Sequence, residues 1–300
     1  MRFSVWPNLA EPWPEVVDLV RHCEGTGWDG VYYADHFMPN TDDGAPADGP
    51  VLECGSMLAA LAAGVPRLRI GSLVYGNTYR HPAVLAKMAA TVDQISGGRF
   101  VLGLGAGWQV NEHEAYGIPM FGVKERLDRF EEACQVITGL LREKRTTFAG
   151  EHYRITDAPC DPKPVQAHLP LLIGAKGERR ALRIVARYAD EWNMWSWPFL
   201  RARRDQLHRY CDDIGRDPAD IRVSTQALLY LADESGKTRE PQPDERPRIV
   251  GTSAEVVETI AAYRDIGVDE FIVPTWTMPT PSERKDTCDR FITDVAAEFR

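Results

Sequence analysis

The chain has 300 residues, 44% of them hydrophobic and 26% charged, which is typical of a globular protein that folds in water. Its formal net charge of -9 at pH 7 gives no electrostatic basis for nucleic-acid binding. No segment is long and apolar enough to predict a membrane span, and the first residues lack the pattern of a secretory signal. The six cysteines form no Cys-x-x-Cys pair, so we expect no zinc ribbon, and free structural thiols in a cytoplasmic protein.

Strand-like and helix-like segments alternate along the whole chain. The expected strands are residues 2–6, 30–34, 67–75, 99–103, 169–173, 190–194, 221–231 and 270–274. The expected helices are about 12–25, 53–63, 82–95, 124–144, 178–188, 198–214, 252–266 and 282–299. This alternation predicts a parallel sheet, and eight such units fit a closed (β/α)8 TIM barrel in a single domain over residues 1–300. A doubly wound open sheet is the main alternative.

Three further segments are inserted between these units. Residues 146–155 alternate like a small hairpin with Gly150 in its turn. Residues 38–50 are rich in glycine, proline and aspartate, and residues 232–248 are rich in charge and proline. We expect both to be mobile loops, and the first is long enough to act as a lid over a site.

Glycines alternate at the end of the fourth expected strand, at positions 103, 105 and 107. Glycine at such places lets something approach the backbone closely. One interpretation is the floor and rim of a binding site, and the other is a tight strand exit packed against a neighbouring helix. A dinucleotide-binding loop is not indicated, because its third glycine would stand where this chain has Trp108.

In a barrel of this kind the active site lies at the carboxyl ends of the strands. The residues expected there are Asp35, His36, Ser72, Leu73, Val74, Asn77, Gly105, Ala106, Gly107, Trp108, Asn111, Gly174, Ala175, Lys176, Gly177, Trp192, Asn193, Trp195, Thr275 and Trp276. The set is aromatic, rich in glycine and poor in carboxylates. It favours a flat, conjugated cofactor over a hydrolytic site, and no metal-binding motif accompanies it.

Two parts of this set allow alternative interpretations. Residues 174–177 precede a helix, where free backbone N–H groups and Lys176 would favour a phosphate, but a simple turn with basic surface residues has the same pattern. His36 could give or take a proton near neutral pH, or it could be a structural histidine paired with Asp35.

The ordered set of motifs resembles the bacterial luciferase-like superfamily of flavin and deazaflavin enzymes. The matching stretches are residues 30–36 (GVYYADH), 68–72 (LRIGS), 81–82 (HP), 93–99 (DQISGGR), 102–108 (LGLGAGW) and 170–177 (PLLIGAKG). The stretches FSVWP at 3–7 and ADHFM at 34–38 resemble the branch that depends on coenzyme F-420, a deazaflavin.

The resemblance implies a (β/α)8 barrel, a homodimer, and a cofactor ring at the mouth of the barrel. It implies a non-proline cis peptide at about Ser72 to Val74, and it places Asp35 and His36 near the ring and the substrate. It also implies that residues 174–177 meet the cofactor phosphate and that Asn111 helps to hold the phosphate or side chain. The sugar-phosphate dehydrogenases of the superfamily carry a glutamate where this chain has Trp108, which argues against transferring their substrate.

The first hypothesis is an oxidoreductase that transfers a hydride between coenzyme F-420 and a small, largely apolar organic substrate. In it His36 is the proton donor or acceptor, Asp35 orients His36, and the substrate pocket is walled by Trp108, Trp192 or Trp276. The second is an FMN-dependent monooxygenase that uses reduced flavin and oxygen. The third is a non-catalytic flavin-binding protein that has kept the fold.

Overall fold

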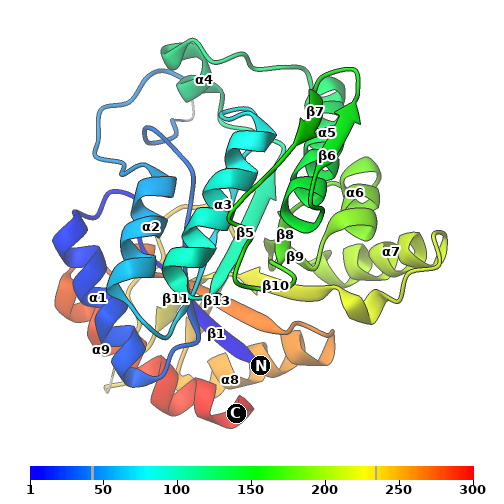
Figure 1. Cartoon of the computed structure of the whole chain (residues 1–300). Coiled ribbons are helices and arrows are strands. Elements are labelled where there is room, and N and C mark those ends of the chain that lie inside the picture. The colour runs from blue at the N-terminus through cyan, green and yellow to red at the C-terminus, as the bar shows by residue number, and fades with distance from the viewer. Residues whose placement is uncertain (42–43, 234) are drawn as a thin grey trace.

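The computed structural model describes residues 1–41, 44–233 and 235–300. Eight parallel strands form a closed barrel, which confirms the predicted fold (Figure 1). They are β1 (Arg2–Trp6), β2 (Gly30–Tyr33), β3 (Arg69–Ser72), β5 (Phe100–Gly105), β8 (Leu171–Gly174), β9 (Glu191–Trp195), β10 (Arg222–Gln226) and β13 (Glu270–Pro274). The pairing of β1 with β13 and of β3 with β5 closes the ring.

Helices surround the barrel and follow the predicted order. They are α1 (Trp13–Thr26), α2 (Cys54–Gly64), α3 (Pro82–Ser96), α5 (Val123–Arg142), α6 (Arg180–Tyr188), α7 (Leu200–Asp212), α8 (Ser253–Asp265) and α9 (Pro281–Arg290). Local signals explain their ends: Gly27 ends α1 in the left-handed conformation, and Thr252 starts α8 with a complete capping box. The predicted last helix continues beyond α9 as a π-helical turn (Phe291–Val295) and a 3-10 turn (Ala296–Phe299).

Three predicted elements differ in the structure. The expected strand over 67–75 is divided into β3 and the short β4 (Tyr75–Gly76), which pairs with β5. The expected strand over 221–231 is divided into β10 and β11 (Leu228–Leu231), and β11 pairs outside the barrel with β12 (Arg248–Gly251). The polar loop after β5 contains an unpredicted helix, α4 (Val110–Tyr116).

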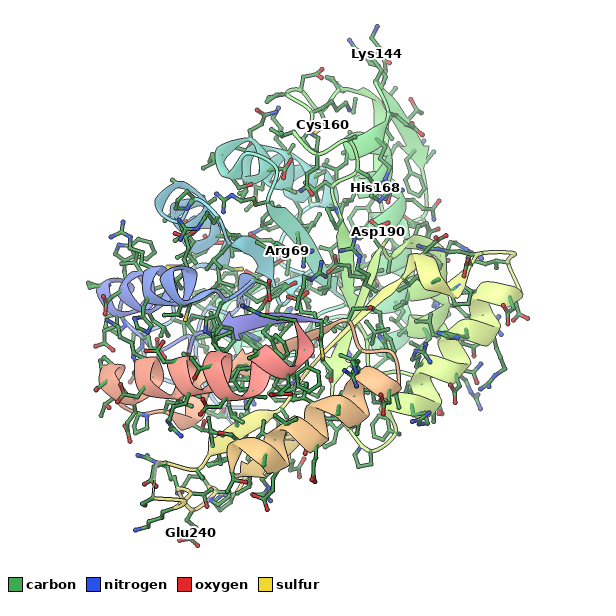
Figure 2. The ribbon with its side chains drawn as sticks, turned by 90° about the horizontal axis from the view of Figure 1, so that it is seen from below. Arg69, Lys144, Cys160, His168, Asp190 and Glu240 are labelled. Carbon is green, nitrogen blue, oxygen red and sulfur yellow. The ribbon has the colours of Figure 1, made fainter. Side chains whose placement is uncertain are left out.

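The inserted segments are partly described. The predicted hairpin is present as β6 (Thr146–Ala149) and β7 (Arg154–Ala158). In the loops expected to be mobile, residues 42–43 and residue 234 lie outside the described residues. Their mobility, like the lid role of residues 38–50, stays a prediction. Figure 2 shows Lys144, at the base of the hairpin, and Glu240, in the second loop, on opposite sides of the molecule.

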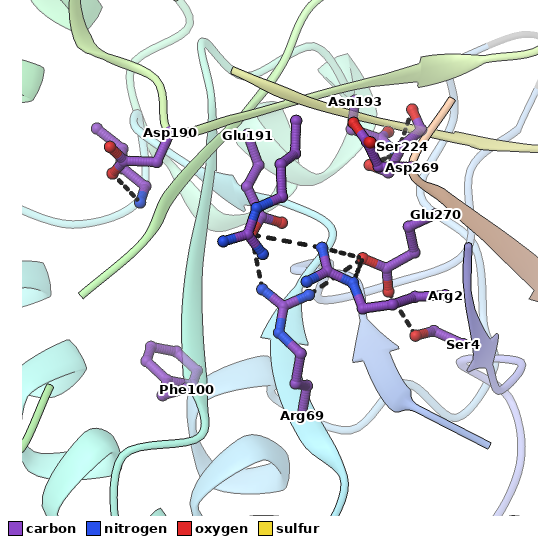
Figure 3. Close-up of polar contacts among 12 residues, drawn as sticks. Arg2, Ser4, Arg69, Phe100, Asp190, Glu191, Asn193, Ser224, Asp269 and Glu270 are labelled. Carbon is purple, nitrogen blue, oxygen red and sulfur yellow. Dashed lines mark hydrogen bonds and ion pairs between the residues drawn. The ribbon is translucent and has the colours of Figure 1, made fainter. Parts of the chain in front are cut away.

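The amino end of the barrel is filled by a buried cluster of charges (Figure 3). Arg69 lies 2.7 Å from Glu191 and 3.1 Å from Glu270, and Figure 2 shows it within the ring of strands. Glu270 also accepts hydrogen bonds from Ser4 (2.5 Å) and Arg2 (3.2 Å). Both carboxylates are at most 2% exposed. Such residues at this end of a barrel contribute to stability rather than to catalysis.

The interior of the barrel is apolar toward the carboxyl ends of the strands. Tyr32, Leu73, Val101, Leu172 and Ile272 form part of this filling, and the partly buried Val74, Trp195 and Trp276 pack onto it. All six cysteines are free and buried, as expected. No helix within the described ranges is long and apolar enough to cross a membrane.

Candidate functional site

The segment between β3 and β4 forms the floor at the carboxyl end of the barrel. Its Leu73–Val74 peptide bond is cis, which confirms the expected non-proline cis peptide. Ser72 fixes this segment to β5, because its hydroxyl donates to the Gly103 carbonyl at 2.8 Å and accepts from the Gly103 N–H at 2.9 Å. The floor is thus held by side-chain hydrogen bonds where the regular ladder between β3 and β5 stops.

The alternating glycines of β5 make room for the protein's own chain. A Cβ atom on Gly105 would lie 2.8 Å from Val74, and one on Gly174 would lie 3.2 Å from it. A Cβ on Gly107 would lie 2.6 Å from the Thr78 hydroxyl, and Gly107 has a φ of 84°. The contacts show tight packing at this strand exit, but against Val74 and Thr78 rather than against the neighbouring helix that was expected. This packing shapes the floor.

Three tryptophans form an aromatic group beside the floor. The ring centroids of Trp6 and Trp276 are 4.6 Å apart, and Trp195 lies 5.8 Å from Trp276. The Arg246 guanidinium lies 4.7 Å from the Trp276 centroid. Trp192 does not belong to this group, so its prediction as a pocket wall is wrong. It is fully buried in the outer core, because neighbouring side chains of a strand point to opposite faces.

His36 pairs with a carboxylate that the sequence did not indicate. Its Nδ1 lies 2.8 Å from the Oε1 of Glu112, on α4. The edge of the exposed Trp108 ring faces the His36 ring, with centroids 5.4 Å apart. Nε2 of His36 has no hydrogen-bond partner among the described residues, and the side chain is 16% exposed. This nitrogen is therefore the one that can exchange a proton with a ligand.

Glu112 is the centre of this arrangement. Besides His36, it accepts hydrogen bonds from the Phe37 backbone N–H at 2.7 Å and from the Tyr79 hydroxyl. Burial alone would raise the pKa of Glu112, but these bonds outweigh it and hold the pKa below its usual value. An ionised Glu112 requires a proton on Nδ1 of His36, so Nε2 of the neutral ring carries the lone pair.

Asp35 has a different partner from the predicted one. It forms a bidentate pair with Arg80, at 2.6 and 3.0 Å, and accepts the Gly76 N–H at 3.0 Å. Burial raises the pKa of this carboxyl, against the opposing effect of Arg80. Arg80 also contacts Glu53, at the start of α2. The expectation that Asp35 orients His36 is wrong, because Arg80 occupies both of its oxygens.

Asn111 is committed to the loop that follows β2. Its side-chain N–H groups donate to the carbonyls of Pro39 (2.9 Å) and Ala45 (3.1 Å), and its oxygen accepts the Glu112 N–H. Asn77 is 3% exposed and donates a backbone hydrogen bond to Gly105 at 2.9 Å. Asn111 thus fastens the loop at the mouth, and its contact with a cofactor stays a prediction.

The remaining predicted residues follow β5 and β8. Ala106 packs against the outer core, and Ala175 accepts a hydrogen bond from the Trp192 indole at 3.0 Å. Lys176 is exposed, with its ammonium 4.4 Å from the centroid of the Trp197 ring. At Gly177 an added Cβ would only touch Ala181, at 3.4 Å. Contact of residues 174–177 with a phosphate stays a prediction.

The residues at the mouth fit a flat deazaflavin ring. Val74, Trp195 and Trp276 offer partly buried apolar surface above a filled barrel, and this is the surface that a conjugated ring needs. His36, just after β2 at the same end of the barrel, presents an unpartnered nitrogen. Together they can bind a ring on one face and move a proton at its edge.

Comparison with known proteins identifies a family and several relatives of this chain. The family described as luciferase-like monooxygenase matches residues 1–246. An F-420-dependent glucose-6-phosphate dehydrogenase of Nakamurella multipartita is 38% identical over 184 residues, covering 59% of this chain and 50% of that protein. One of Microbacterium testaceum is 35% identical over 231 residues, covering 75% and 60%. The chain thus spans about half the length of these curated relatives.

Two solved structures share the fold. An F-420-dependent secondary alcohol dehydrogenase in complex with an F-420-acetone adduct has a TM-score of 0.83 at 17% identity, covering 99% of this chain and 98% of that one. The coenzyme F-420-dependent tetrahydromethanopterin reductase of Methanopyrus kandleri also has a TM-score of 0.83 at 17% identity, covering 100% and 99%.

Proposed function

The chain belongs to the luciferase-like monooxygenase family, and from this premise we propose that it is an oxidoreductase dependent on coenzyme F-420. The observation that carries the proposal is the presence of the His36–Glu112 pair and of an apolar floor at the same, carboxyl end of the barrel. The F-420-dependent relatives at 35–38% identity support the deazaflavin over FMN as the cofactor.

Binding of the ring is the task of the floor and the aromatic group. Val74, Trp195 and Trp276 would contact the ring, while Gly174, Ala175, Lys176 and Gly177 would hold the phosphate at the end of β8. When bound, the deazaflavin gives or accepts a hydride at its C5. Exclusion of water from this surface strengthens the electrostatic interactions around it.

Proton transfer is the task of His36. The Glu112 carboxylate keeps the proton on Nδ1, so Nε2 can take a proton from a substrate hydroxyl or return one to a carbonyl. Glu112 also stabilises the imidazolium that forms when Nε2 is protonated. Asp35 acts indirectly in this scheme, because its pair with Arg80 fixes the backbone from which His36 projects.

The substrate would be a small organic molecule with a largely apolar body. The tryptophan group and the exposed Trp108 support this class, because they offer aromatic rather than charged walls. A homodimer and a cytoplasmic location, both expected from the sequence, stay predictions of this proposal.

The proposal is tested by titrating the purified protein with coenzyme F-420 and, separately, with FMN. We expect saturable binding of F-420, seen as a change in its absorbance, and weaker binding of FMN. Binding of FMN alone would overturn it.

A second measurement concerns His36. In a His36→Ala variant that still binds F-420, kcat should fall by about 100-fold or more, as expected for loss of a general acid or base. The matched control is His208→Ala on α7, outside the site, which should keep its turnover. Unchanged turnover of the His36 variant would remove this residue from the mechanism.

A further inference from the structure

A cavity is lined by the segment that follows β4 and by residues from α5, from the loop before α5 and from the hairpin. It has a volume of about 260 Å³. It is lined by Asn77, Thr78, Tyr79, Arg80, His81, Pro119, Phe121, Arg126, Arg129 and Tyr153. Residues 77–81 of its lining directly follow β4, and Gly76 of β4 pairs with Gly105 at the carboxyl end of β5, so this part of the lining lies next to the mouth.

The lining of this cavity is basic. Three arginines and a histidine contribute to it, and none of its lining residues is a carboxylate. Arg80 is neutralised by Asp35 and Glu53, and Arg129 pairs with Glu125 at 2.8 Å. Arg126 forms no ion pair with any carboxylate in the described part of the chain, and it donates to the Gly107 carbonyl at 2.8 Å. Its charge is therefore available to a ligand.

A buried amide faces the same cavity with an unused group. Asn77 is 3% exposed, and its Oδ1 has no hydrogen-bond partner among the described residues. Its Nδ2 lies 3.4 Å from the Tyr153 hydroxyl. Oxygen and nitrogen of an amide exchange places on a half-turn. After this turn Tyr153 donates to Oδ1, and the free position holds an N–H donor.

We propose that this cavity binds a phosphate or carboxylate group through Arg126, Arg129 and Asn77. The anion would belong to a ligand whose body lies in the mouth. The reason is that the backbone N–H of Asn77 donates to the Gly105 carbonyl, and the Arg126 guanidinium donates to the Gly107 carbonyl, both at the mouth. Two sources share this chemistry: an anionic group of the cofactor other than the phosphate that we assign to residues 174–177, or a phosphorylated substrate. This assignment of the ligand rests on the proposed function, whereas the anion site itself does not.

The test begins with inorganic phosphate and the cofactor-free protein, measured by isothermal titration calorimetry. Wild type should bind phosphate saturably. The affinity should fall about tenfold or more in Arg126→Gln, because a hydrogen bond between charged groups is lost. Arg129→Gln and Tyr153→Phe should weaken binding less. Arg145→Gln, which removes one positive charge from the exposed hairpin, is the control and should bind like wild type.

The outcomes separate clearly. Absence of saturable binding by wild type, or equal affinity in Arg126→Gln, Tyr153→Phe and wild type, would overturn the proposal. Equal weakening in Arg145→Gln would also overturn it, because the effect would then come from net charge. The Tyr153→Phe variant keeps every charge and removes one hydroxyl, so its weaker binding supports the site independently of Arg126.

Competition identifies the source of the anion. Displacement of phosphate by F-420 and not by glucose 6-phosphate supports the cofactor, and the reverse supports a phosphorylated substrate. Displacement by neither would contradict a ligand that extends from the mouth. Failure of the proposed function is seen separately, as absence of the F-420 absorbance change, and leaves the phosphate measurement intact.

Discussion

The two ends of the barrel both bury charged side chains, but they arrange them differently. At the amino end, Glu191 and Glu270 meet Arg2 and Arg69, and all four residues stand on barrel strands. At the carboxyl end, the Glu112–His36 pair joins a helix to a strand end and leaves one ring nitrogen uncommitted. The charges on strands are all paired with one another inside the barrel, whereas the pair between a helix and a strand end leaves Nε2 of His36 without a partner among the described residues.

The largest effect on stability is expected when a carboxylate is removed from the charge cluster at the amino end. In Glu270→Ala, the free energy of unfolding should fall by about 3–5 kcal/mol, because Arg69 and Arg2 lose a buried carboxylate. Urea unfolding measures this loss, with the exposed Glu298→Ala as its control. A loss below about 1 kcal/mol, as for an ordinary surface pair, would show that the two ends do not differ in this way.

A smaller effect should distinguish the ends by their response to pH. Burial raises the pKa of Glu191, so the ionised form costs stability, and this cost disappears as the pH falls through the raised pKa. The pKa of Glu112 is lowered, because hydrogen bonds outweigh burial. Its contribution is present above the unfolded-state pKa and is lost as the pH falls through the folded-state pKa.

The two glutamates should therefore behave oppositely when each is replaced by glutamine. As the pH falls from about 7 to about 4, wild type should lose stability relative to Glu112→Gln and gain it relative to Glu191→Gln. Urea unfolding at several pH values gives both differences. A change of the same sign in both pairs would contradict the contrast between the ends.

The smallest effect is expected at the rim of the mouth. Trp108→Ala should change the free energy of unfolding by only about 0.5 kcal/mol, because the side chain is 59% exposed. Loss of its edge contact with His36 should lower kcat/KM about 2- to 10-fold, as expected for an aromatic pair of about 0.5–1.5 kcal/mol. Ile95→Ala, a comparably exposed side chain at the end of α3, should leave kcat/KM unchanged.

The sequence was sufficient for the barrel because burial and turn signals are local. Apolar runs marked the strands, and glycines and Thr252 marked helix ends. The same runs could not show which sheet a strand joins, so 221–231 was predicted as one strand although β11 leaves the barrel for β12. A run of apolar residues shows that a segment is buried, but it does not show which strand the segment pairs with.

A site residue was predictable where its place at the end of a strand determines its place at the mouth of the barrel. His36 was predicted from its place at a strand end, and the cis peptide was expected from the family resemblance. The partner of His36 is 76 residues away on α4, a helix with few apolar residues and no periodicity to reveal it. Tyr79 and Arg80 were visible only as a polar run after the third strand. The alternation of side chains along β9 could have shown that Asn193 faces inward and Trp192 outward.

The double contact of Arg80 has a consequence for how this protein can change. Asp35 and Glu53 flank the loop of residues 38–50 in the sequence, and Arg80 forms hydrogen bonds to both carboxylates at once. An insertion or deletion between Asp35 and Glu53 therefore leaves these two contacts of Arg80 in place, whereas the hydrogen bonds of Asn111 to Pro39 and Ala45 limit where in the loop it can fall. A loop exchanged between these two carboxylates would keep the contacts of Arg80 with Asp35 and Glu53, and with them the backbone beside His36.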